Sequence, residues 1–237
     1  MKLLELMRAL TPAPLELPAR YAYSKLRGTL DPEMKPLREI IRPGGRAIDV
    51  GANFGIYTYV LADFCAEVEA FEPIPACVEV IRAYGAKNVR VHPVALSNLS
   101  GTAVLNVPAV DGSPVNGHAS LRPMDFRGQR LEVPLRRLDE YSFRDVSFIK
   151  IDVEGHEWEV LEGASETLRR ERPVLFVEIE QRHLPGRKMS SIFDLQQVIY
   201  SLDGNQLFSS TDSGGSLSDE EEINIYDGAI LPGPHNI

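Results

Sequence analysis

Short apolar runs alternate along this chain with longer segments in which apolar residues recur every three or four positions. The short runs predict β-strands, and the longer segments predict amphipathic helices. The predicted strands cover residues 46–50, 67–72, 88–96, 146–153 and 173–180. The predicted helices cover residues 55–66, 75–86, 156–170 and 191–204. Strands that alternate with helices in this way are typical of a parallel sheet covered on both faces, so the pattern predicts an α/β fold.

The N-terminal part of the chain precedes this alternation. Apolar residues within 3–10 suit one face of a short amphipathic helix, and residues 11–20 form a Pro-rich connector. A second short helix is predicted to start with Asp31 as its N-cap and Pro32 at its first position. We therefore expect residues 1–43 to form an N-terminal helical extension.

The C-terminal part contains two further apolar runs, "NQLFSS" and "EEINIYDGAIL", joined by a flexible acidic stretch. These runs predict a closing antiparallel hairpin. Residues 44–237 are accordingly predicted to form a single doubly wound, Rossmann-like domain. Its sheet is expected to be mostly parallel and seven-stranded.

Residues 108–130 interrupt the alternation. They are rich in Gly, Pro and Ser and have no clear period, which predicts a long surface loop. Loops of this length in compact domains commonly carry function, so we expect a lid or an acceptor-binding insert. Arg122, Arg127 and Arg130 within it could hold an anionic group, or could serve only to keep the loop hydrated.

The composition limits the classes of partner. The chain has 237 residues, with 43% hydrophobic and 25% charged residues, as is ordinary for a globular domain. Its net charge of −9 disfavours non-specific binding to nucleic acid or anionic lipid. No apolar run is long enough to span a bilayer, and Glu5 and Arg8 interrupt the apolar start. Cys65 and Cys77 fall in helical patterns, which predicts buried reduced thiols and a cytoplasmic setting.

The sequence "DVGANFG" follows the first predicted strand and opens the first long helix. Gly51 and Gly55 would let the backbone approach a ligand closely, although a plain strand-to-helix turn is the alternative. Their spacing differs from the G-x-G-x-x-G of dinucleotide-binding turns. Asp49 before them would repel a pyrophosphate and would suit a cationic ligand such as S-adenosyl-L-methionine. Asn53 lies between the two glycines.

Glu72 ends the second predicted strand, 23 residues after Asp49. A carboxylate at this place can accept hydrogen bonds from two ribose hydroxyls. Nicotinamide-dependent enzymes use the same contact, and Glu72 could alternatively be a helix-start acid before Pro73. The glycine loop and Glu72 together therefore indicate an adenosyl ligand without naming it.

Ionisable residues crowd the end of the fourth predicted strand, in "FIKIDVEGHEWEVLEG". Asp152 would lie beside the end of the first strand, where active sites of open α/β sheets form. Glu154 could orient an acceptor or cap the helix. His156 is a candidate general base or a structural hydrogen-bonding residue, and Glu157 is expected to support the helix start. Glu178, at the end of the fifth strand, would need a partner such as Lys150 or an acceptor hydroxyl.

A mixed set of one His and several carboxylates could in principle bind a metal ion. Asp152, Glu154 and His156, however, are spaced across a strand-to-helix junction, so they need not converge. No second His or Cys cluster supports a metal site. A hydrogen-bonded network is the interpretation we favour.

The segments "AIDVGANFGIYTYVLA", "AFEPIP", "PVALSN", "FIKIDVEGHEWEVLEGA" and "RPVLFVEIE" resemble the FkbM-type methyltransferase family. The resemblance runs from about residue 45 to about residue 183, and "KIDVEGHE" is its most specific part. It implies a Rossmann-like methyltransferase fold, binding of S-adenosyl-L-methionine and O-methylation, commonly of a sugar or natural product. It places the methionine side of the donor on Asp49, Gly51, Asn53 and Gly55, the ribose on Glu72, and the adenine at Ala95 and Leu96.

The leading hypothesis is therefore an O-methyltransferase that acts on a small-molecule or glycan acceptor. Asp152, His156, Glu178 and Glu154 are its candidate catalytic residues, and Asp152 also lies near the expected methyl group. A neutral alcohol must lose a proton during transfer, which is why a base is expected. A nicotinamide-dependent oxidoreductase and a catalytically silent adenosyl-binding subunit remain as alternatives. The acceptor and the oligomeric state, including a homo-oligomer, stay open.

Overall fold

The computed structural model describes most of the chain up to Glu178 and the backbone of three short strands after it. The described residues are 11–31, 34–35, 37–110, 113–122, 127–178, 207–210, 224–226 and 229–231. The helices predicted at 3–10 and 191–204 lie outside them.

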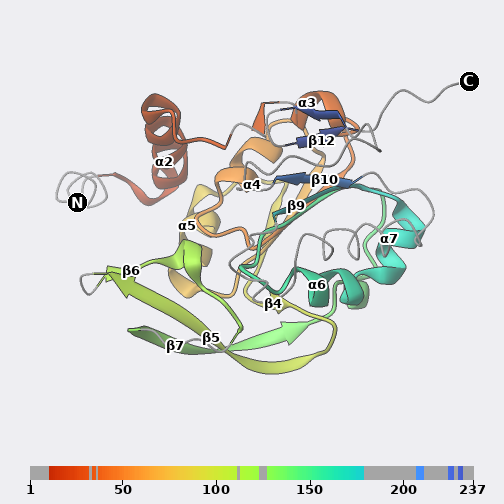
Figure 1. Ribbon diagram of the computed structural model, residues 1–237. Helices are drawn as coiled ribbons and strands as arrows, with labels where there is room; N and C mark the ends of the chain where they lie inside the picture. Colours follow the sequence, from red (N-terminus) through yellow and green to blue (C-terminus); the bar gives the residue numbers. More distant parts are fainter. Residues whose placement is uncertain are drawn as a thin grey trace, which may run out of the picture.

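The central sheet has six parallel strands in the order β10-β9-β8-β1-β2-β3. Its strands are β1 (Arg46–Val50), β2 (Glu67–Phe71), β3 (Val89–His92), β8 (Val146–Ile151), β9 (Val174–Glu178) and β10 (Leu207–Ser210). The chain builds outward from β1 to β3 and then returns to the other side of β1 with β8. β9 and β10 lie side by side beyond β8 (Figure 1). This order confirms the doubly wound α/β fold. The described residues give six strands in this sheet where seven were predicted.

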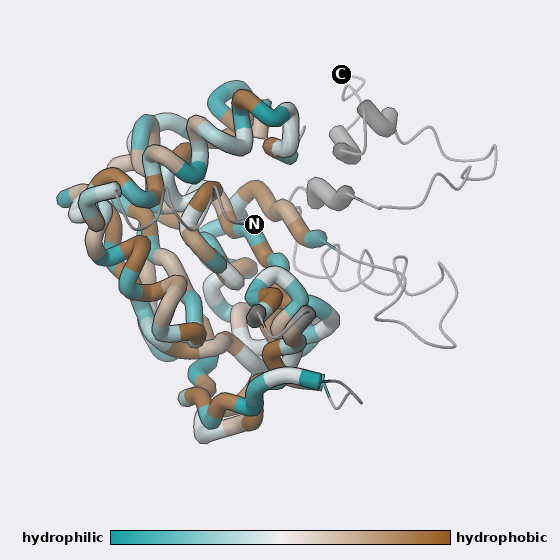
Figure 2. Tube along the Cα trace, turned by 90° about the vertical axis from the view of Figure 1, so that its left-hand side faces the viewer, coloured by the Kyte–Doolittle hydropathy of each residue, from teal (hydrophilic) through white to brown (hydrophobic). Residues whose placement is uncertain are grey.

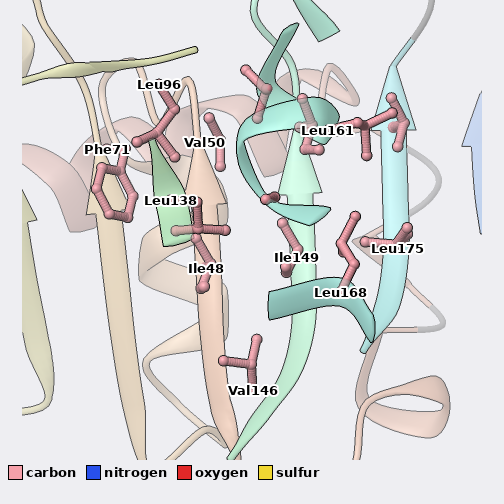
Figure 3. Close-up of a cluster of buried hydrophobic side chains, with 14 residues drawn as sticks. Ile48, Val50, Phe71, Leu96, Leu138, Val146, Ile149, Leu161, Leu168 and Leu175 are labelled. Atoms are coloured by element: carbon pink, nitrogen blue, oxygen red, sulfur yellow. The ribbon is translucent and has the colours of Figure 1, made fainter. Parts of the chain in front are cut away.

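Helices and apolar side chains cover both faces of the sheet, as the alternation of strand and helix predicts. On one face, Ile48 of β1 and Ile149 of β8 meet Leu161 and Leu168 (Figure 3). These two leucines come from α6 (Glu157–Gly163) and α7 (Ser165–Glu171), which replace the single helix predicted over 156–170. The opposite face packs Ala47 and Phe148 against α4 (Ile56–Leu61) and α3 (Leu37–Ile40). Every residue of β8 is buried, which is typical of the middle strand of such a sheet.

The strand predicted over 88–96 is in fact two strands in different sheets. β3 ends at His92, and β4 (Ala95–Leu96) pairs with β7 (Gly128–Arg136) instead. Pro93 between them has no backbone N–H to continue the ladder, so the chain turns away there. This turn carries Ala95 and Leu96 across the end of the central sheet.

The segment 108–130 is less of a loop than its composition indicates. β5 (Gly101–Val110) pairs antiparallel with β7 from Gly101↔Leu135 to Pro108↔Gly128, so both edges of the segment belong to a long hairpin. The prediction of one continuous loop was therefore wrong at its two ends. Leu105 and Val107 of β5 are buried in a separate apolar cluster, and Asn106 between them is also buried. Short β6 (Ser113–Pro114) and a 3₁₀ turn, η2 (Asn116–His118), lie between the strands.

The prediction of a Pro-rich connector over residues 11–20 was wrong, because a helix, α2 (Ala13–Arg27), covers most of it. Pro14 lies in the first turn, where its missing N–H costs little, while Pro18 lies inside the helix. The buried side chain of Leu17 packs on the α4 start and on α5 (Pro75–Tyr84). The helix expected from Asp31 begins only at Leu37.

The C-terminal hairpin also differs from the prediction. β10 joins the central sheet, parallel to β9, and does not pair with the following strands. The antiparallel hairpin forms within residues 224–231, between β11 (Asn224–Tyr226) and β12 (Ala229–Leu231). "NQLFSS" was therefore assigned to the wrong partner.

Hydrophobic and hydrophilic residues are intermixed along the coloured tube of Figure 2. In agreement, the helices of the described residues include none with the length and apolar character needed to cross a membrane.

The end of β1 is packed so tightly against the end of β8 that only glycine fits at residue 51. Gly51 has a left-handed φ of 73°, and a Cβ atom there would lie 1.8 Å from the carbonyl oxygen of Asp152. Gly28 has a similar φ of 67° at the end of α2, but a Cβ there meets nothing within 4 Å.

We predict that Gly28→Ala lowers the free energy of unfolding by about 1 kcal/mol, the cost of a left-handed alanine alone. Gly51→Ala should cost about 3 kcal/mol or more, because it adds overpacking against backbone. Urea denaturation of both variants would measure the difference. Equal losses would show that the contact between β1 and β8 is not tight.

Candidate active site

Two loops meet where β1 and β8 end side by side, and the chain leaves the two strands toward different parts of the fold. Such a switch point at the carboxyl edge of a doubly wound sheet is where ligands bind. The amides of Gly51 and Ala52 donate to the carbonyl of Phe71 at the end of β2, at 3.0 and 3.1 Å. The amide of Asp152 donates to Val50 at 3.1 Å. These bonds fix both loops to the sheet.

Two cavities open at this place. The larger has a volume of about 390 Å³ and lies between α2 and the loop that follows β1, with Lys150 and Asp152 also in its wall. The smaller, of about 70 Å³, is lined by Glu72, Ala95 and Leu96 among others. Gly51, Asn53 and Asp152 line both cavities and form the partition between them.

Lys150 is the centre of the charge network beneath this partition. Its Nζ lies 2.9 Å from Oδ2 of Asp152 and 3.9 Å from Oδ1 of Asp49, and 4.8 Å from the ring centroid of Tyr57. Burial lowers the pKa of Lys150, but the charges of Asp152 and Asp49 outweigh burial and raise the pKa above its ordinary value. The ammonium group therefore stays charged, although its side chain is almost fully buried.

Asp49 lies behind Lys150 and is completely buried. Its Oδ2 accepts a hydrogen bond of 2.6 Å from the Thr58 hydroxyl, while Oδ1 has no hydrogen-bond donor among the described residues. Burial raises the pKa of Asp49, against the opposing effects of Lys150 and Thr58. In this structure Asp49 and Gly55 lie outside the described linings of the two cavities, so Asp49 is placed to act through Lys150.

Glu72 is buried in the wall of the smaller cavity. Its two carboxylate oxygens accept hydrogen bonds of 2.8 Å from the amides of Asn53 and Ile74. Burial nevertheless raises the pKa of Glu72 to about 7. Each oxygen has a second lone pair, so the group can still accept hydrogen bonds from a ligand.

The turn between β8 and α6 is stabilised by the carboxylate of Glu157. Glu154 and Gly155 have left-handed φ values of 54° and 94°, and the amide of Gly155 donates to Glu157 at 2.7 Å. This bond confirms the prediction that Glu157 supports the helix start. The Glu154 side chain faces His118 at 3.5 Å, and Glu154 lines the smaller cavity. His118 belongs to residues 113–122, which lie between β5 and β7 and are called the hairpin insert.

The hairpin insert covers the smaller cavity from the outside. Ser120 donates its hydroxyl to the Glu154 carbonyl at 2.7 Å, and Arg122 donates to the Gly155 carbonyl. Asn116, Ala119 and Leu121 line the cavity directly. Arg122 therefore binds the insert to the β8–α6 turn, while Arg127 and Arg130 are exposed.

Unlike Asp152, His156 and Glu178 are not part of the described lining of the larger cavity. His156 lines the smaller cavity, where its Nε2 lies 3.0 Å from the Ser97 hydroxyl, and burial lowers its pKa, so the ring is held neutral. Glu178 is half-buried at the end of β9 and contributes to the raised pKa of Lys150, one of the two partners considered for it from the sequence. Within the described linings, His156 faces only the smaller cavity and Glu178 faces neither.

No group of three or more His, Cys, Asp or Glu side chains within the described residues is arranged to hold a metal ion. Cys65 and Cys77 are both buried free thiols, and burial raises the pKa of Cys65 to about 11.

A comparison with protein families matches residues 49–206 to the methyltransferase FkbM domain. The chain belongs to the FkbM methyltransferase family. The matched range starts at Asp49 and includes both loops of the partition, Glu72 and the hairpin insert, whereas α2 lies before it.

Two solved structures are similar to this chain. One is a methyltransferase FkbM from Methylobacillus flagellatus KT, with 18% identity, a TM-score of 0.48 and 81% of this chain covered. This chain spans about half of that protein, 49% of its length. The other is an rRNA methylase from Streptococcus thermophilus, with 11% identity, a TM-score of 0.36, and coverage of 79% of this chain and 72% of that one. A comparison with curated proteins gives no match.

The sequence did not single out two features of this FkbM-family site. Lys150 was considered only as a partner of Glu178, although a lysine inside the apolar run "FIKI" is a signal for a buried ion pair. The residues of α2 that line the larger cavity were not predicted either, because the prolines in this segment favoured a connector over a helix. Both are brought to the site by contacts between distant parts of the chain.

We predict that Lys150→Met lowers the free energy of unfolding by about 3–5 kcal/mol at pH 7, because it leaves Asp49 buried without its counter-charge. The additional substitution Asp49→Asn should restore much of the loss, since it removes the stranded charge. Denaturation curves of the single and double variants would measure both effects.

The pH dependence provides a second check on Lys150→Met. Without Lys150, the folded-state pKa of Asp49 rises further above its ordinary value of 3.8. A carboxyl whose pKa is raised by folding destabilises the protein as pH increases, so the deficit should shrink as pH falls from 7 toward 4. A deficit that is independent of pH would contradict the role assigned to Asp49.

Proposed function

We propose that this protein transfers a methyl group from S-adenosyl-L-methionine to a hydroxyl oxygen of a sugar, a glycan or a small natural product. The observation that carries the proposal is the partition of Gly51, Asn53 and Asp152, which separates an adenosine-type cavity from a larger one. Because the two cavities share these residues, they adjoin at this point. A donor in one cavity and an acceptor in the other can therefore bring their reacting atoms together in line.

The residues of the smaller cavity fit the donor. Glu72 offers a buried carboxylate that can accept hydrogen bonds from ribose hydroxyls, and the apolar pair Ala95 and Leu96 offers a surface for adenine. Gly51 keeps the backbone bare at the partition, where a side chain would collide with Asp152. Asn53 and Asp152 complete the donor contacts at the partition, and Asp49 holds Lys150 behind it.

When bound, S-adenosyl-L-methionine would supply a methyl group on a positively charged sulfur. The carbon–sulfur bond would break as the acceptor oxygen bonds to the carbon, and its electron pair would stay on sulfur. Asp152 accepts the proton that leaves the hydroxyl, since its carboxylate reaches the larger cavity. Lys150 holds this carboxylate in place at 2.9 Å, and Glu178 adds to the negative field around Lys150.

His156 and Glu154 act on the donor side in this proposal. Both line the smaller cavity, and both belong to the turn that the hairpin insert covers. His156 is neutral and bonded to Ser97, next to the proposed adenine surface of Ala95 and Leu96. Glu154 orients the insert through His118.

Calorimetric titration with S-adenosylhomocysteine tests the donor site, with NAD as the comparison ligand. We expect the demethylated donor to bind and NAD not to bind. Binding of NAD alone would instead support an oxidoreductase. Donor binding without transfer to any member of a broad hydroxylated panel would support a non-catalytic adenosyl-binding subunit.

We predict that Glu72→Ala weakens S-adenosylhomocysteine binding by about 1.5–3 kcal/mol, the usual loss for hydrogen bonds to a charged acceptor. The wild-type affinity should also rise with pH. Burial raises the pKa of Glu72 to about 7, and hydroxyl donors favour the ionised form, so binding should tighten by up to ~10-fold between pH 6 and pH 8. Glu72→Gln should lose this slope, and a variant that kept it would contradict the assignment.

We predict that Asp152→Asn lowers kcat by about 10²–10⁴-fold, the usual contribution of a general base, when an acceptor from the hydroxylated panel is used. His156→Gln is the matched comparison and should lower kcat by less than about tenfold, because its ring faces the donor side. Steady-state kinetics would decide between the two residues. A larger loss in His156→Gln than in Asp152→Asn would make His156 the base.

A further inference from the structure

The outer wall of the larger cavity comes from residues that precede the family domain. The FkbM match begins at residue 49, whereas the outer wall includes Glu16, Arg20, Tyr23, Ser24, Thr29 and Asp31. α2 supplies the first four of these residues, and in Figure 1 it stands beside α4 and α5. The inner wall, with Gly51, Asn53 and Asp152, belongs to the family domain.

α2 is held against the family domain by several contacts, so its cavity-facing side has a defined place. Leu17 is fully buried and packs on Gly55. A Cβ atom added at Gly55 would lie only 3.2 Å from the Leu17 Cδ2. The rings of Tyr21 and Tyr59 lie 5.0 Å apart. The guanidinium of Arg20 lies 3.8 Å from the ring centroid of Phe54, another residue of the cavity wall. These contacts bury apolar area and add a cation–π interaction.

The charges in the wall of this cavity are nearly balanced. The carboxylates are Glu16, Asp31 and Asp152, and the cations are Arg20 and Lys150, so the lining carries a net charge of −1. Both cations already face carboxylates: Arg20 donates to Glu16 at 2.7 Å, and Lys150 to Asp152 at 2.9 Å. The sulfonium donor carries a net charge of +1, because its ammonium and carboxylate groups cancel. The donor would lie in the smaller cavity, whose lining adds the carboxylates of Glu72 and Glu154, and Asp49 lies 3.9 Å from Lys150. The larger cavity therefore has no excess positive charge to offer an acceptor.

An anionic acceptor would find little to bind in this cavity. A phosphate or carboxylate would have to displace the ion pair of Arg20 or of Lys150 and would approach the exposed carboxylate of Asp31. An uncharged molecule with hydroxyl groups can instead use the polar side chains of Ser24 and Thr29 and the ring of Tyr23.

We propose that α2, together with the segment after it, is the specificity-determining wall of the acceptor site, and that this site admits uncharged hydroxylated acceptors and excludes anionic ones. The inference rests on the proposed methyl transfer. It adds that acceptor choice is made by residues 11–31 and Met34, outside the family domain, through the Glu16–Arg20 pair and the lack of excess positive charge in the cavity wall.

A thiol introduced into this wall would report the local electrostatic potential of the cavity through its rates of reaction with charged and uncharged reagents. Ser24→Cys introduces one, and the native Cys65 and Cys77 are buried and should react slowly. Thr102→Cys, at an exposed position of β5, is the control on the same protein. The rates of alkylation by uncharged iodoacetamide and anionic iodoacetate are measured for both variants, with and without S-adenosylhomocysteine.

We expect the preference for iodoacetamide over iodoacetate to be at least about threefold larger in Ser24→Cys than in Thr102→Cys, as expected for nearby carboxylates. Adding Glu16→Gln to Ser24→Cys should reverse this difference, because Arg20 then lacks its counter-charge. Equal preferences in the two single variants, or a preference for iodoacetate in Ser24→Cys, would overturn the charge selection.

The same variants test whether the cavity takes the acceptor. Treating Ser24→Cys with N-ethylmaleimide should leave the Kd for S-adenosylhomocysteine within about twofold, since the donor site is separate. Transfer to uncharged methyl glycosides and phenols should fall more than about tenfold relative to treated Thr102→Cys, because acceptors can no longer reach the partition. Unchanged transfer after treatment, or a higher kcat/KM for a glycoside phosphate than for its uncharged parent, would overturn the proposal. Loss of donor binding in the untreated wild type would instead refute the proposed function.

Discussion

The ammonium group of Lys150 is buried between two carboxylates at the point where β1 and β8 end, and the candidate site depends on this interaction. A lysine in the middle strand of a sheet is tolerable only if its charge is compensated. Asp49 compensates it from behind and Asp152 from the cavity side. The strand that builds the core therefore also fixes the carboxylate that we assign to proton transfer.

Tight backbone packing keeps this charge network in register. The two loops touch where Gly51 passes the Asp152 carbonyl, and the amide of Gly51 is bonded to β2 while that of Asp152 is bonded to β1. The same loops form the partition between the two cavities. Because the partition is built from strand ends and not from mobile surface segments, donor and acceptor can be held in a constant relation. The hairpin insert covers the smaller cavity, and α2, from a distant part of the sequence, covers the larger one.

The parts of the fold that depend on local pattern could be predicted from the sequence. β1, β2 and β8 are short apolar runs, and the glycine loop and the ionisable strand end identify the edge of the sheet that carries the site. α2 could not be predicted in this way, because its stability comes from Leu17 and Tyr21 packing on residues about forty positions away in sequence. The course of the chain after His92 depends likewise on pairing between Ala95 and Leu135. Pro93 is compatible with this pairing but does not predict it. The central position of Lys150 emerges only when β1 and β8 are neighbours.

The most direct test of this account is a crystal structure of the full chain with S-adenosylhomocysteine. The account predicts that the adenosine lies in the cavity of Glu72, Ala95 and Leu96, and that the sulfur lies at the partition and faces the larger cavity beside Asp152. Adenosine bound against α2 in the larger cavity, or a sulfur atom directed away from Asp152, would contradict it.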